Sequence, residues 1–319
     1  MAAVSRRMKR ISGGRSGYDG HAMKLGAIFP QTECGTDVPA IADYARAVED
    51  MGYDHLFVAD HVLGADPRHH SHPSLATYSH TAVVHETMTL LAYLAAVTRR
   101  IGLATGILIL PQRQTALVAK QAAEIDVLSG GRLRLGIGVG WNAVEYEALG
   151  LPFDDRGARC AEQIEVMREL WTKPVVDYTG KWHRIRHAGL NPAPIQRPIP
   201  VWLGVGSRER PHPPEAVLRR VARLADGWSP NFAPDAAGRD VVARVHGYAR
   251  EAGRDPAKLP LEGRIRLAGQ DSTGWRAQAD QWRALGATHL IAEARGAKLS
   301  FPDGHLTTLR QFRTTHFKT

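Results

Sequence analysis

The stretch IGLATGILIL at Ile101–Leu110, together with LRLGIGV at Leu133–Val139, indicates the fold class most clearly. Both runs are short and apolar, as expected of strands that are buried on both faces. The connecting residues 116–128 carry apolar side chains at helical spacing and end at the turn Ser129-Gly130-Gly131. A strand, a helix and a second strand in this order predict a βαβ unit with parallel strands.

The same alternation continues in both directions from this unit. Further strands are expected at residues 24–30, 55–59, 201–205, 227–229, 261–267 and 288–292. Further helices are expected at residues 38–51, 87–98, 159–172, 217–225, 237–252, 275–285 and 305–317. Eight strands, each followed by a helix, predict an α/β protein with a (β/α)8 TIM barrel. A doubly wound sheet would need fewer units and a clear boundary in the middle of the chain.

Two segments interrupt the alternation and predict insertion loops at the C-terminal face of the barrel. Residues 61–85 form a long polar stretch, and residues 174–200 are rich in proline and include a candidate hairpin at 178–182. Long loops in barrels are usually lids or binding loops, so we expect both segments to influence substrate choice. We expect residues 1–22 to form a flexible basic extension and residues 23–319 to form a single domain.

Composition narrows the class of protein. The net charge is +9, but arginine is spread along the predicted helices, which argues against a clustered nucleic-acid surface. The alternative is a basic rim that attracts an anionic cofactor or substrate. Two cysteines far apart give no disulfide framework and fit a cytoplasmic location. No apolar run approaches the roughly 18 residues that a membrane span needs. We therefore expect a cytoplasmic protein that binds neither nucleic acid nor membrane.

Functional side chains in a TIM barrel follow the C-terminal ends of the strands. Ala59, Asp60 and His61 follow the second predicted strand, and a histidine there can exchange a proton near neutral pH. The alternative is a histidine that only caps a loop. Gly106 interrupts the third strand, which indicates a bulge, the close approach of a ligand, or a packing glycine.

Glycines also follow the fourth and fifth strands. The run GIGVGWN at Gly136–Asn142 is similar to the dinucleotide pattern GxGxxG, but Trp141 stands where the third glycine is required. We interpret these glycines as positions where backbone approaches a flat ring. The turn at Gly204-Val205-Gly206-Ser207 precedes a helix, and its N–H groups could bind an anion such as phosphate. A plain tight turn is the alternative.

Substrate contacts are expected at the long loop and beside it, at His85, Glu86 and Trp228. Trp141 and Trp228 are interpreted as pocket wall. The run at residues 69–72 contains three histidines but has no cysteines or paired carboxylates nearby, so we expect no metal site. The sequence also lacks the GxSxG pattern of a serine nucleophile.

As a set, five segments resemble the bacterial luciferase-like oxidoreductases, and within them the branch that uses the deazaflavin coenzyme F420. They include GYDHLFVADH at 52–61, LAAVTRRI at 94–101, ILPQR at 109–113 with AKQAA at 119–123, the stretch 128–150, and LADGW at 224–228. The likeness covers about residues 24–295. It implies a luciferase-like barrel with the cofactor ring lying across its mouth.

The resemblance also implies roles for individual residues. A non-prolyl cis peptide would lie at Gly106-Ile107 and press on the central ring of the cofactor. His61 would be the catalytic proton donor or orienting group. The remaining cofactor-binding positions implied are Ala59 and Asp60 beside the ring, Gly140, Trp141 and Asn142 along its edge, and Gly204, Val205, Gly206 and Ser207 at the phosphate.

The sequence departs from the family pattern at two places. The paired glycine after the fifth strand is Gly204-Val205 here and precedes a proline-rich stretch, which weakens the expected phosphate contacts. Trp141 stands where some members carry a glutamate, so a carboxylate acid or base is not expected there.

We therefore expect hydride transfer between F420 and a small-molecule organic substrate. A reduced-FMN monooxygenase of the same fold is the first alternative, and a non-catalytic flavin-binding barrel is the second. Because members of this family often form dimers, a homodimer is one expected assembly, although the sequence itself shows no interface.

Overall fold

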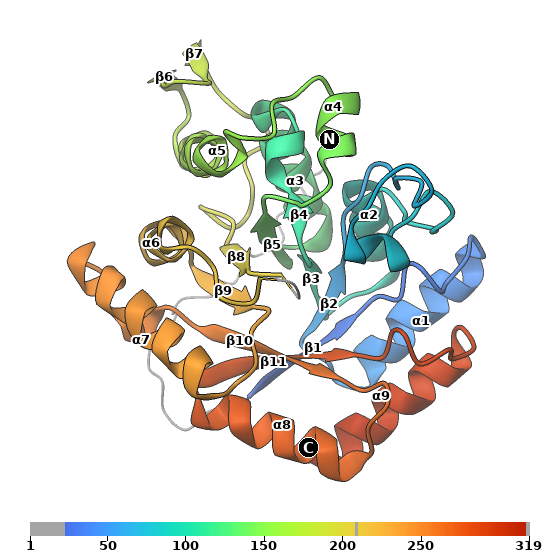
Figure 1. Ribbon diagram of the computed structural model, residues 1–319. Helices are drawn as coiled ribbons and strands as arrows, with labels where there is room; N and C mark the ends of the chain where they lie inside the picture. Colours follow the sequence, from blue (N-terminus) through green and yellow to red (C-terminus); the bar gives the residue numbers. More distant parts are fainter. Residues whose placement is uncertain (1–22, 208–209, 317–319) are drawn as a thin grey trace, which may run out of the picture.

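The computed structural model describes residues 23–207 and 210–316, so the predicted extension at 1–22 lies outside the described residues. The central sheet of the protein closes into a parallel barrel (Figure 1). The strand order is β3-β2-β1-β11-β10-β9-β8-β5-β4, and a further pairing between β3 and β5 closes the barrel. The strands are β1 (Lys24–Ile28), β2 (His55–Val58), β3 (Gly102–Thr105), β4 (Leu108–Ile109), β5 (Leu133–Gly138), β8 (Val201–Val205), β9 (Gly227–Pro230), β10 (Leu261–Arg266) and β11 (Ala287–Glu293). Because β3 and β4 fill one position, this is the predicted (β/α)8 barrel.

Helices surround the barrel on its outer side (Figure 1). They are α1 (Val38–Asp50), α2 (Thr87–Val97), α3 (Thr115–Ser129), α5 (Arg156–Thr172), α6 (Glu215–Leu224), α7 (Ala236–Glu251), α8 (Ser272–Ala284) and α9 (Asp303–His316). Short 3-10 turns lie at η1 (Pro73–Ala76), η2 (Leu110–Gln112) and η3 (Pro256–Lys258). The predicted hairpin is formed by β6 (Val176–Thr179) and β7 (Arg184–Ala188), which pair antiparallel. The short helix α4 (Ala143–Ala148) was not predicted.

The third barrel strand is not continuous, which corrects the expectation for Ile101–Leu110. It breaks between β3 and β4 at Gly106-Ile107, and the peptide bond between these two residues is cis, as the resemblance implied. After the break, the Ile109 N–H donates to Asp60 Oδ2 at 2.9 Å instead of continuing a regular ladder. A bulge was one of the interpretations that Gly106 allowed in the sequence, and the structure shows the break at that glycine.

The inner face of the barrel is only partly apolar. Ile28, Phe57, Ala104 and Ile291 form a small buried cluster of their own, contributed by β1, β2, β3 and β11. The main apolar core is formed by the other buried side chains, many of them from the helices and from the strand faces. On β10, Glu262 and Arg264 line the inner cavity. The interior is therefore a mixed surface that leaves room for a polar ligand.

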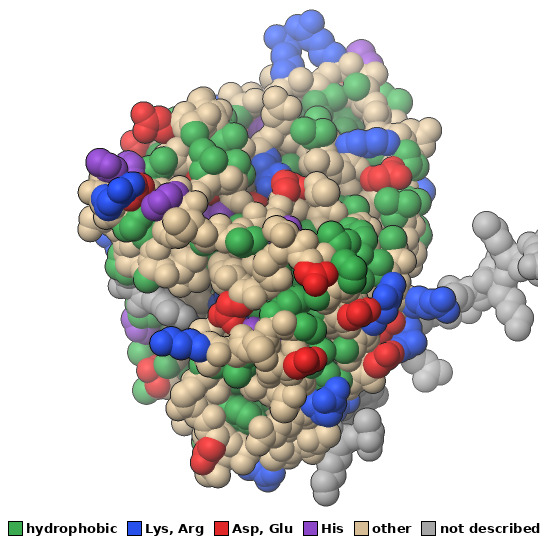
Figure 2. Space-filling view, turned by 90° about the vertical axis from the view of Figure 1, so that its right-hand side faces the viewer, with side chains coloured by type: hydrophobic (Ala, Val, Ile, Leu, Met, Phe, Trp, Pro, Cys, Tyr) green, Lys and Arg blue, Asp and Glu red, His purple; other side chains and the backbone are tan. Residues whose placement is uncertain are grey.

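Charge is dispersed on the face of the molecule that Figure 2 shows. Lys and Arg side chains stand singly there, among acidic and apolar ones. A nucleic-acid surface would require a continuous basic stripe, which this face does not present. No helix in the described part of the chain has the length and apolar character of a membrane span.

Candidate active site

A large hollow opens where the barrel strands end. It has a volume of about 1280 Å³ and is lined by residues that follow or end β1, β2, β3, β5, β8, β9, β10 and β11. Pockets at this face are where TIM barrels bind their ligands. We refer to it as the mouth cavity.

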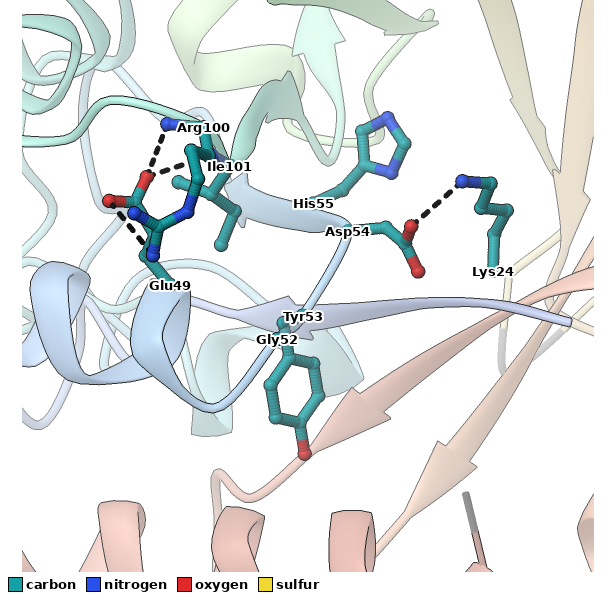
Figure 3. A pocket seen from close by; sticks show the side chains of 8 residues that line it. All are labelled: Lys24, Glu49, Gly52, Tyr53, Asp54, His55, Arg100 and Ile101. Atoms are coloured by element: carbon teal, nitrogen blue, oxygen red, sulfur yellow. Dashed lines mark hydrogen bonds and ion pairs between the residues drawn. The ribbon is translucent and has the colours of Figure 1, made fainter. Parts of the chain in front are cut away.

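A smaller hollow of about 390 Å³ lies at the opposite end, where the strands begin (Figure 3). Its charged groups already have partners: Lys24 Nζ lies 2.9 Å from Asp54 Oδ1. The Arg100 and Ile101 N–H groups donate to Glu49 Oε2 at 2.6 and 2.8 Å. These contacts hold the barrel bottom together, which favours the mouth cavity as the candidate active site.

Most of the predicted site residues line the mouth cavity. They are Ala59, Asp60, His61, Gly106, Ile107, Gly140, Trp141, Gly204, Val205, Gly206 and Ser207. Residues from four separate strands and their loops thus meet around one space. The loop at 61–85 also contributes to this wall, through Pro73 and Tyr78 among others.

Two predicted positions on the loops lie outside the cavity wall, which corrects their assignment. His85 Nε2 contacts the Gly35 carbonyl oxygen at 3.0 Å. Glu86 caps α2, where it accepts from the Thr89 N–H at 2.7 Å, and it pairs with Arg113 at 3.0 Å. Glu86 thus stabilises the start of α2, and neither side chain is among those that line the mouth cavity.

Asn142 and Trp228 are also absent from the cavity wall. Asn142 is 3% exposed, caps α4 through Val144 N at 3.2 Å, and donates to the Leu63 carbonyl at 3.2 Å. Trp228 is fully buried in the apolar core. Since successive side chains of a strand alternate, Trp228 points outward while Ser229 lines the cavity. Trp228 was expected in the pocket wall because it lies near the end of a strand. The alternation along that strand instead directs its side chain away from the cavity.

The other predicted loop, residues 174–200, contributes nothing to the cavity wall in the described structure. Its hairpin packs on α5, where Glu162 accepts hydrogen bonds from the backbone N–H groups of Lys181, Trp182 and His183 at 2.9 Å each. An influence of this segment on substrate choice is therefore not supported by its position.

The strand glycines make room for the bulge at Gly106-Ile107. A Cβ at Gly204 would lie 2.6 Å from Ile107 Cγ2, and one at Gly138 would lie 2.6 Å from Ile107 Cδ1. At Gly140, whose φ is +67°, a Cβ would lie 2.7 Å from Ile109 Cγ2. The glycines therefore converge as expected, but they accommodate isoleucine side chains, and Ile107 itself contributes to the cavity surface.

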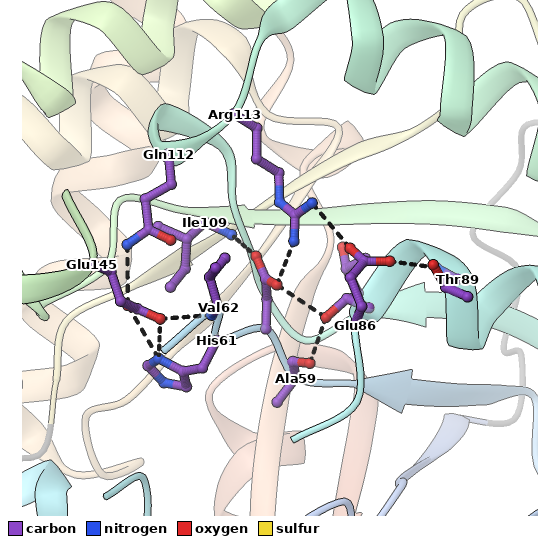
Figure 4. A network of polar contacts seen from close by, with 12 residues as sticks. Ala59, His61, Val62, Glu86, Thr89, Ile109, Gln112, Arg113 and Glu145 are labelled. Atoms are coloured by element: carbon purple, nitrogen blue, oxygen red, sulfur yellow. Dashed lines mark hydrogen bonds and ion pairs between the residues drawn. The ribbon is translucent and has the colours of Figure 1, made fainter. Parts of the chain in front are cut away.

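His61 is held in place by a buried carboxylate (Figure 4). Its Nδ1 lies 3.2 Å from Glu145 Oε1, and 8% of its side chain is exposed. Because Nδ1 faces Glu145, Nε2 is the ring nitrogen left for a bound molecule in the cavity. This is the arrangement by which a carboxylate fixes the tautomer and orientation of a catalytic histidine.

Glu145 is the most important site residue that the sequence did not reveal. Its side chain is fully buried and also accepts from the N–H groups of Val62 and Leu63 at 2.7 and 3.1 Å, and from Gln112 Nε2 at 3.1 Å. Burial would raise the pKa of Glu145, but the hydrogen bonds from His61 and Gln112 outweigh it and lower that pKa below its usual value. Asn142 and Glu145 have capping-box spacing, which could have located α4 but not this contact.

Asp60 has a structural role at the cavity wall. Its carboxylate accepts from Arg113 Nη2 at 2.7 Å, from Thr87 Oγ1 at 3.1 Å and from the Ile109 N–H at 2.9 Å (Figure 4). Both of its oxygens are thus occupied. Asp60 connects the end of β2 to the bulge and to α2, so it positions the cavity wall on which a ring could lie.

Aromatic side chains close one side of the mouth cavity. The rings of His61 and Tyr78 lie 4.3 Å apart, and those of His72 and Trp141 stack at 4.1 Å with an interplanar angle of 14°. Trp141 therefore lies in the pocket wall, as expected. His72 stacks on it and caps η1, and the described residues hold no group of three or more metal-ligating side chains.

A basic pair lies at the side of the cavity next to β8. Arg156 is the first residue of α5. Arg220 on α6 lies beside the next residue of that helix, since a Cβ at Gly157 would be 2.7 Å from Arg220 Nη2. Burial lowers the pKa of Arg220, and no carboxylate of the described residues lies within 4 Å of its guanidinium. Arg156 and Arg220 both line the mouth cavity, and guanidinium groups in such a position can bind an anion.

The β8 turn itself contributes less to anion binding than expected. The Ser207 N–H donates to the Arg210 carbonyl at 3.0 Å, and Ser207 Oγ accepts from the Arg210 N–H at 3.0 Å. The Ser207 N–H is therefore used within the chain, and the side chains of Arg156 and Arg220 supply positive charge nearby.

A closed parallel barrel with polar side chains around a cavity at its C-terminal mouth defines a TIM-barrel protein with its ligand site at the usual end of the fold. The chain matches the luciferase-like monooxygenase family over residues 20–313 and belongs to that family. An uncharacterized protein of Mycobacterium tuberculosis is 35% identical over 231 residues, which cover 71% of this chain and 77% of that protein.

Solved structures share the fold at low sequence identity. An F420-dependent secondary alcohol dehydrogenase, solved with an F420-acetone adduct, has a TM-score of 0.73 and 18% identity, and covers 92% of this chain and 98% of that one. EDTA monooxygenase from Chelativorans sp. BNC1 has a TM-score of 0.74 and 15% identity, with 92% of each chain covered. The chain is thus an oxidoreductase-family barrel related in fold to both kinds of enzyme.

Proposed function

We propose that this protein is an F420-dependent oxidoreductase, which transfers a hydride between the deazaflavin and a small organic substrate. The observation that carries the proposal is the mouth cavity, in which His61, the Ile107 bulge and the Arg156–Arg220 pair surround one space. The fold-level likeness to an F420-dependent dehydrogenase supports it.

The residues present fit this cofactor. Ile107 offers an apolar surface on which a flat ring can lie, and the glycines around it leave no further side chain in the way. Arg156 and Arg220 would hold the phosphate of the cofactor, because paired guanidinium groups match a phosphate oxyanion. The long anionic tail of F420 is compatible with a mouth cavity that also contains Arg210 at its rim.

When bound, F420 supplies or accepts the hydride, and the protein supplies position and protons. His61 Nε2 would give a proton to the substrate, or take one from it, as the hydride is transferred. Glu145 keeps the ring of His61 oriented for that exchange. Tyr78 and the stacked pair of His72 and Trp141 would exclude water from this side of the cavity.

A reduced-FMN monooxygenase is the second candidate. The name of the family and the fold-level likeness to EDTA monooxygenase favour it. The same anion site would hold the single phosphate of FMN. A non-catalytic barrel is less well supported. A protein that only binds a flavin would not need a buried carboxylate to orient a histidine toward the cavity.

Titration with both cofactors tests the proposal. Tryptophan fluorescence of the purified chain is followed while oxidised F420, and in a separate experiment FMN, is added. We expect F420 to bind at least about tenfold more tightly than FMN, a difference of about 1.4 kcal/mol. Tighter binding of FMN, with oxygen consumption when reduced FMN is supplied, would contradict the proposal and favour the monooxygenase.

A further inference from the structure

A phenol from the loop at residues 61–85 lies beside His61 in the wall of the mouth cavity. The ring centroids of His61 and Tyr78 are 4.3 Å apart with an interplanar angle of 39°, and both residues line the cavity. Exclusion of water needs only the ring of Tyr78, which leaves the role of its hydroxyl to be explained.

Backbone contacts fix the position of Tyr78 in its loop. Its N–H donates to the Ser74 carbonyl at 3.0 Å, within the turn that η1 begins. The next residue, Ser79, forms an isolated parallel bridge with Ala65, and the His80 N–H donates to the Ala65 carbonyl at 3.2 Å. The loop therefore presents Tyr78 to the cavity from a braced backbone.

A nearly buried guanidinium group contacts the oxygen of the Tyr78 hydroxyl. Arg295 Nη1 donates to Tyr78 Oη at 2.7 Å, and 13% of the Arg295 side chain is exposed. Nε and Nη2 of Arg295 donate to Glu293 Oε1 at 3.1 and 2.6 Å. Burial would raise the pKa of Glu293, but the charges of Arg264 and Arg295 lower it to about 2. Glu293 is therefore ionised near neutral pH and holds Arg295 against Tyr78.

The contact with Arg295 makes the Tyr78 hydroxyl a hydrogen-bond donor toward other groups. A phenol can accept through its oxygen and donate its single proton, whereas a guanidinium can only donate. The Tyr78 proton must therefore point away from Arg295, and no group among residues 23–207 and 210–316 accepts it. Because hydrogen bonds in a chain polarise one another, acceptance from a charged donor strengthens the Tyr78 O–H as a donor.

His61 and Tyr78 are thus oriented by groups of opposite charge. Glu145 lies 3.2 Å from His61 Nδ1, which leaves Nε2 for the exchange of a proton (Figure 4). Arg295 leaves the Tyr78 O–H for donation. A proton-exchanging nitrogen and a hydroxyl donor on adjacent rings suit one ligand oxygen, because an oxygen can accept hydrogen bonds from both. A protonated imine nitrogen has no lone pair and could not accept either bond.

We propose that Tyr78 is a second catalytic residue, which donates a hydrogen bond to the oxygen on the reacting carbon of the substrate. This inference rests on the proposed function and deepens it. The substrate class that follows is a small carbonyl compound, or the alcohol that its reduction gives.

The roles of the two side chains differ. As the hydride reaches the carbonyl carbon, the π electron pair of the C=O bond moves onto oxygen, and the proton of His61 Nε2 completes the hydroxyl group. Tyr78 keeps its own proton and stabilises the negative charge that develops on the oxygen. In the reverse direction His61 Nε2 takes the hydroxyl proton as the hydride leaves the carbon.

Infrared spectroscopy of bound ketones tests this contact, with cyclohexanone and acetophenone as probes. The carbonyl stretch is recorded on the protein alone and on the protein with oxidised F420, which has no hydride to give. A hydrogen bond to the carbonyl oxygen lowers the wavenumber of this stretch, so wild type should give a lower value than Tyr78→Phe. Tyr93→Phe removes a hydroxyl of α2 that does not line the cavity, and this matched control should give the wild-type value.

Turnover gives a second measurement. With reduced F420 and the same ketones, Tyr78→Phe should lower kcat by about 10²-fold, the usual effect of removing one donor to a developing oxyanion. Tyr93→Phe should keep the wild-type kcat, and F420 affinity should be equal in all three proteins. Circular dichroism of each variant confirms folding. A bound ketone with the expected shift supports the contact even where that ketone is not reduced.

Three results would overturn this inference: no binding of either ketone, the same carbonyl stretch in wild type and Tyr78→Phe, or a wild-type kcat in Tyr78→Phe. The two proposals fail separately. A chain that binds F420 but neither ketone would contradict only the role of Tyr78 and the substrate class. A chain that shows the shift in the carbonyl stretch but does not bind F420 would contradict only the proposed function.

Discussion

The two sides of the barrel interior differ sharply in chemistry. On one side, β1, β2 and β3 contribute Ile28, Phe57 and Ala104, which pack together as in an ordinary core. On the other side, β10 contributes Glu262, Arg264 and Arg266. A buried ion pair is often no more stabilising than an apolar pair of the same volume, so folding alone does not require the charged side. Both sides border the mouth cavity, since Phe57 also lines it, but only the charged side offers polar groups to a ligand.

The largest effect on stability is expected on the charged side. Glu262→Leu leaves the Arg134 guanidinium buried without its carboxylate, and should lower the free energy of unfolding by about 3–5 kcal/mol. Urea unfolding measures this. The double variant Arg134→Met with Glu262→Leu should recover most of the loss, because no unpaired charge remains. If Glu262→Leu alone is as stable as wild type, the Arg134–Glu262 pair is solvated. The contrast between the charged and the apolar side of the barrel interior would then be lost.

His61 carries the next largest effect, on turnover. His61→Ala should reduce turnover by about 10²-fold or more, which is typical for a general acid or base, while F420 affinity and folding are retained. Steady-state kinetics with an identified substrate and the F420 titration measure the two quantities. Unchanged turnover would exclude His61 from the reaction.

Glu145 acts through His61 and should have a smaller effect. Glu145→Gln keeps an oxygen for the Val62 N–H but removes the negative charge beside His61 Nδ1, so we expect turnover to fall about tenfold. Steady-state kinetics of Glu145→Gln beside those of His61→Ala measures this. Wild-type turnover in Glu145→Gln would contradict the positioning role of Glu145.

Acid should destabilise the protein through the histidines at the barrel bottom. Burial, and then the charge of Arg134, lower the pKa of His289 to about 3. Below its ordinary pKa of about 6.5 the unfolded chain binds a proton that the folded chain does not. Stability is therefore present above pH 6.5 and is lost as the pH falls toward 3, by at most about 1.4 kcal/mol per pH unit.

Chemical unfolding between pH 7 and pH 4 measures this loss. His289→Leu should reduce the slope, although His55, whose pKa burial also lowers, will keep part of it. His187→Asn is the control, since that side chain is exposed and its φ of 46° suits asparagine. An equal slope in wild type and His289→Leu would contradict this account.

The smallest effect is expected on the apolar side. Ile28→Val removes one methylene from the cluster with Phe57 and Ala104, and should cost about 1 kcal/mol with no change in F420 binding. Urea unfolding and the F420 titration check this. A loss of ligand affinity here would show that the apolar side also contributes to binding.

The sequence predicted the barrel well because alternating apolar runs and amphipathic segments report directly on which elements form. It predicted the mouth less well. Trp228 was expected in the pocket because site residues of a TIM barrel lie near the ends of its strands. The alternation along β9 instead directs its side chain into the apolar core. Glu145 was missed, because its contact with His61, 84 positions away, leaves no local pattern in the sequence. Spacing along one element cannot show what faces it across a cavity.

A crystal structure of the chain grown with F420 tests the central claim most directly. We expect the deazaflavin ring to lie against Ile107 with His61 beside it, and the phosphate to lie between Arg156 and Arg220. A ring bound outside the mouth cavity, or a phosphate bound away from Arg156 and Arg220, would contradict the account.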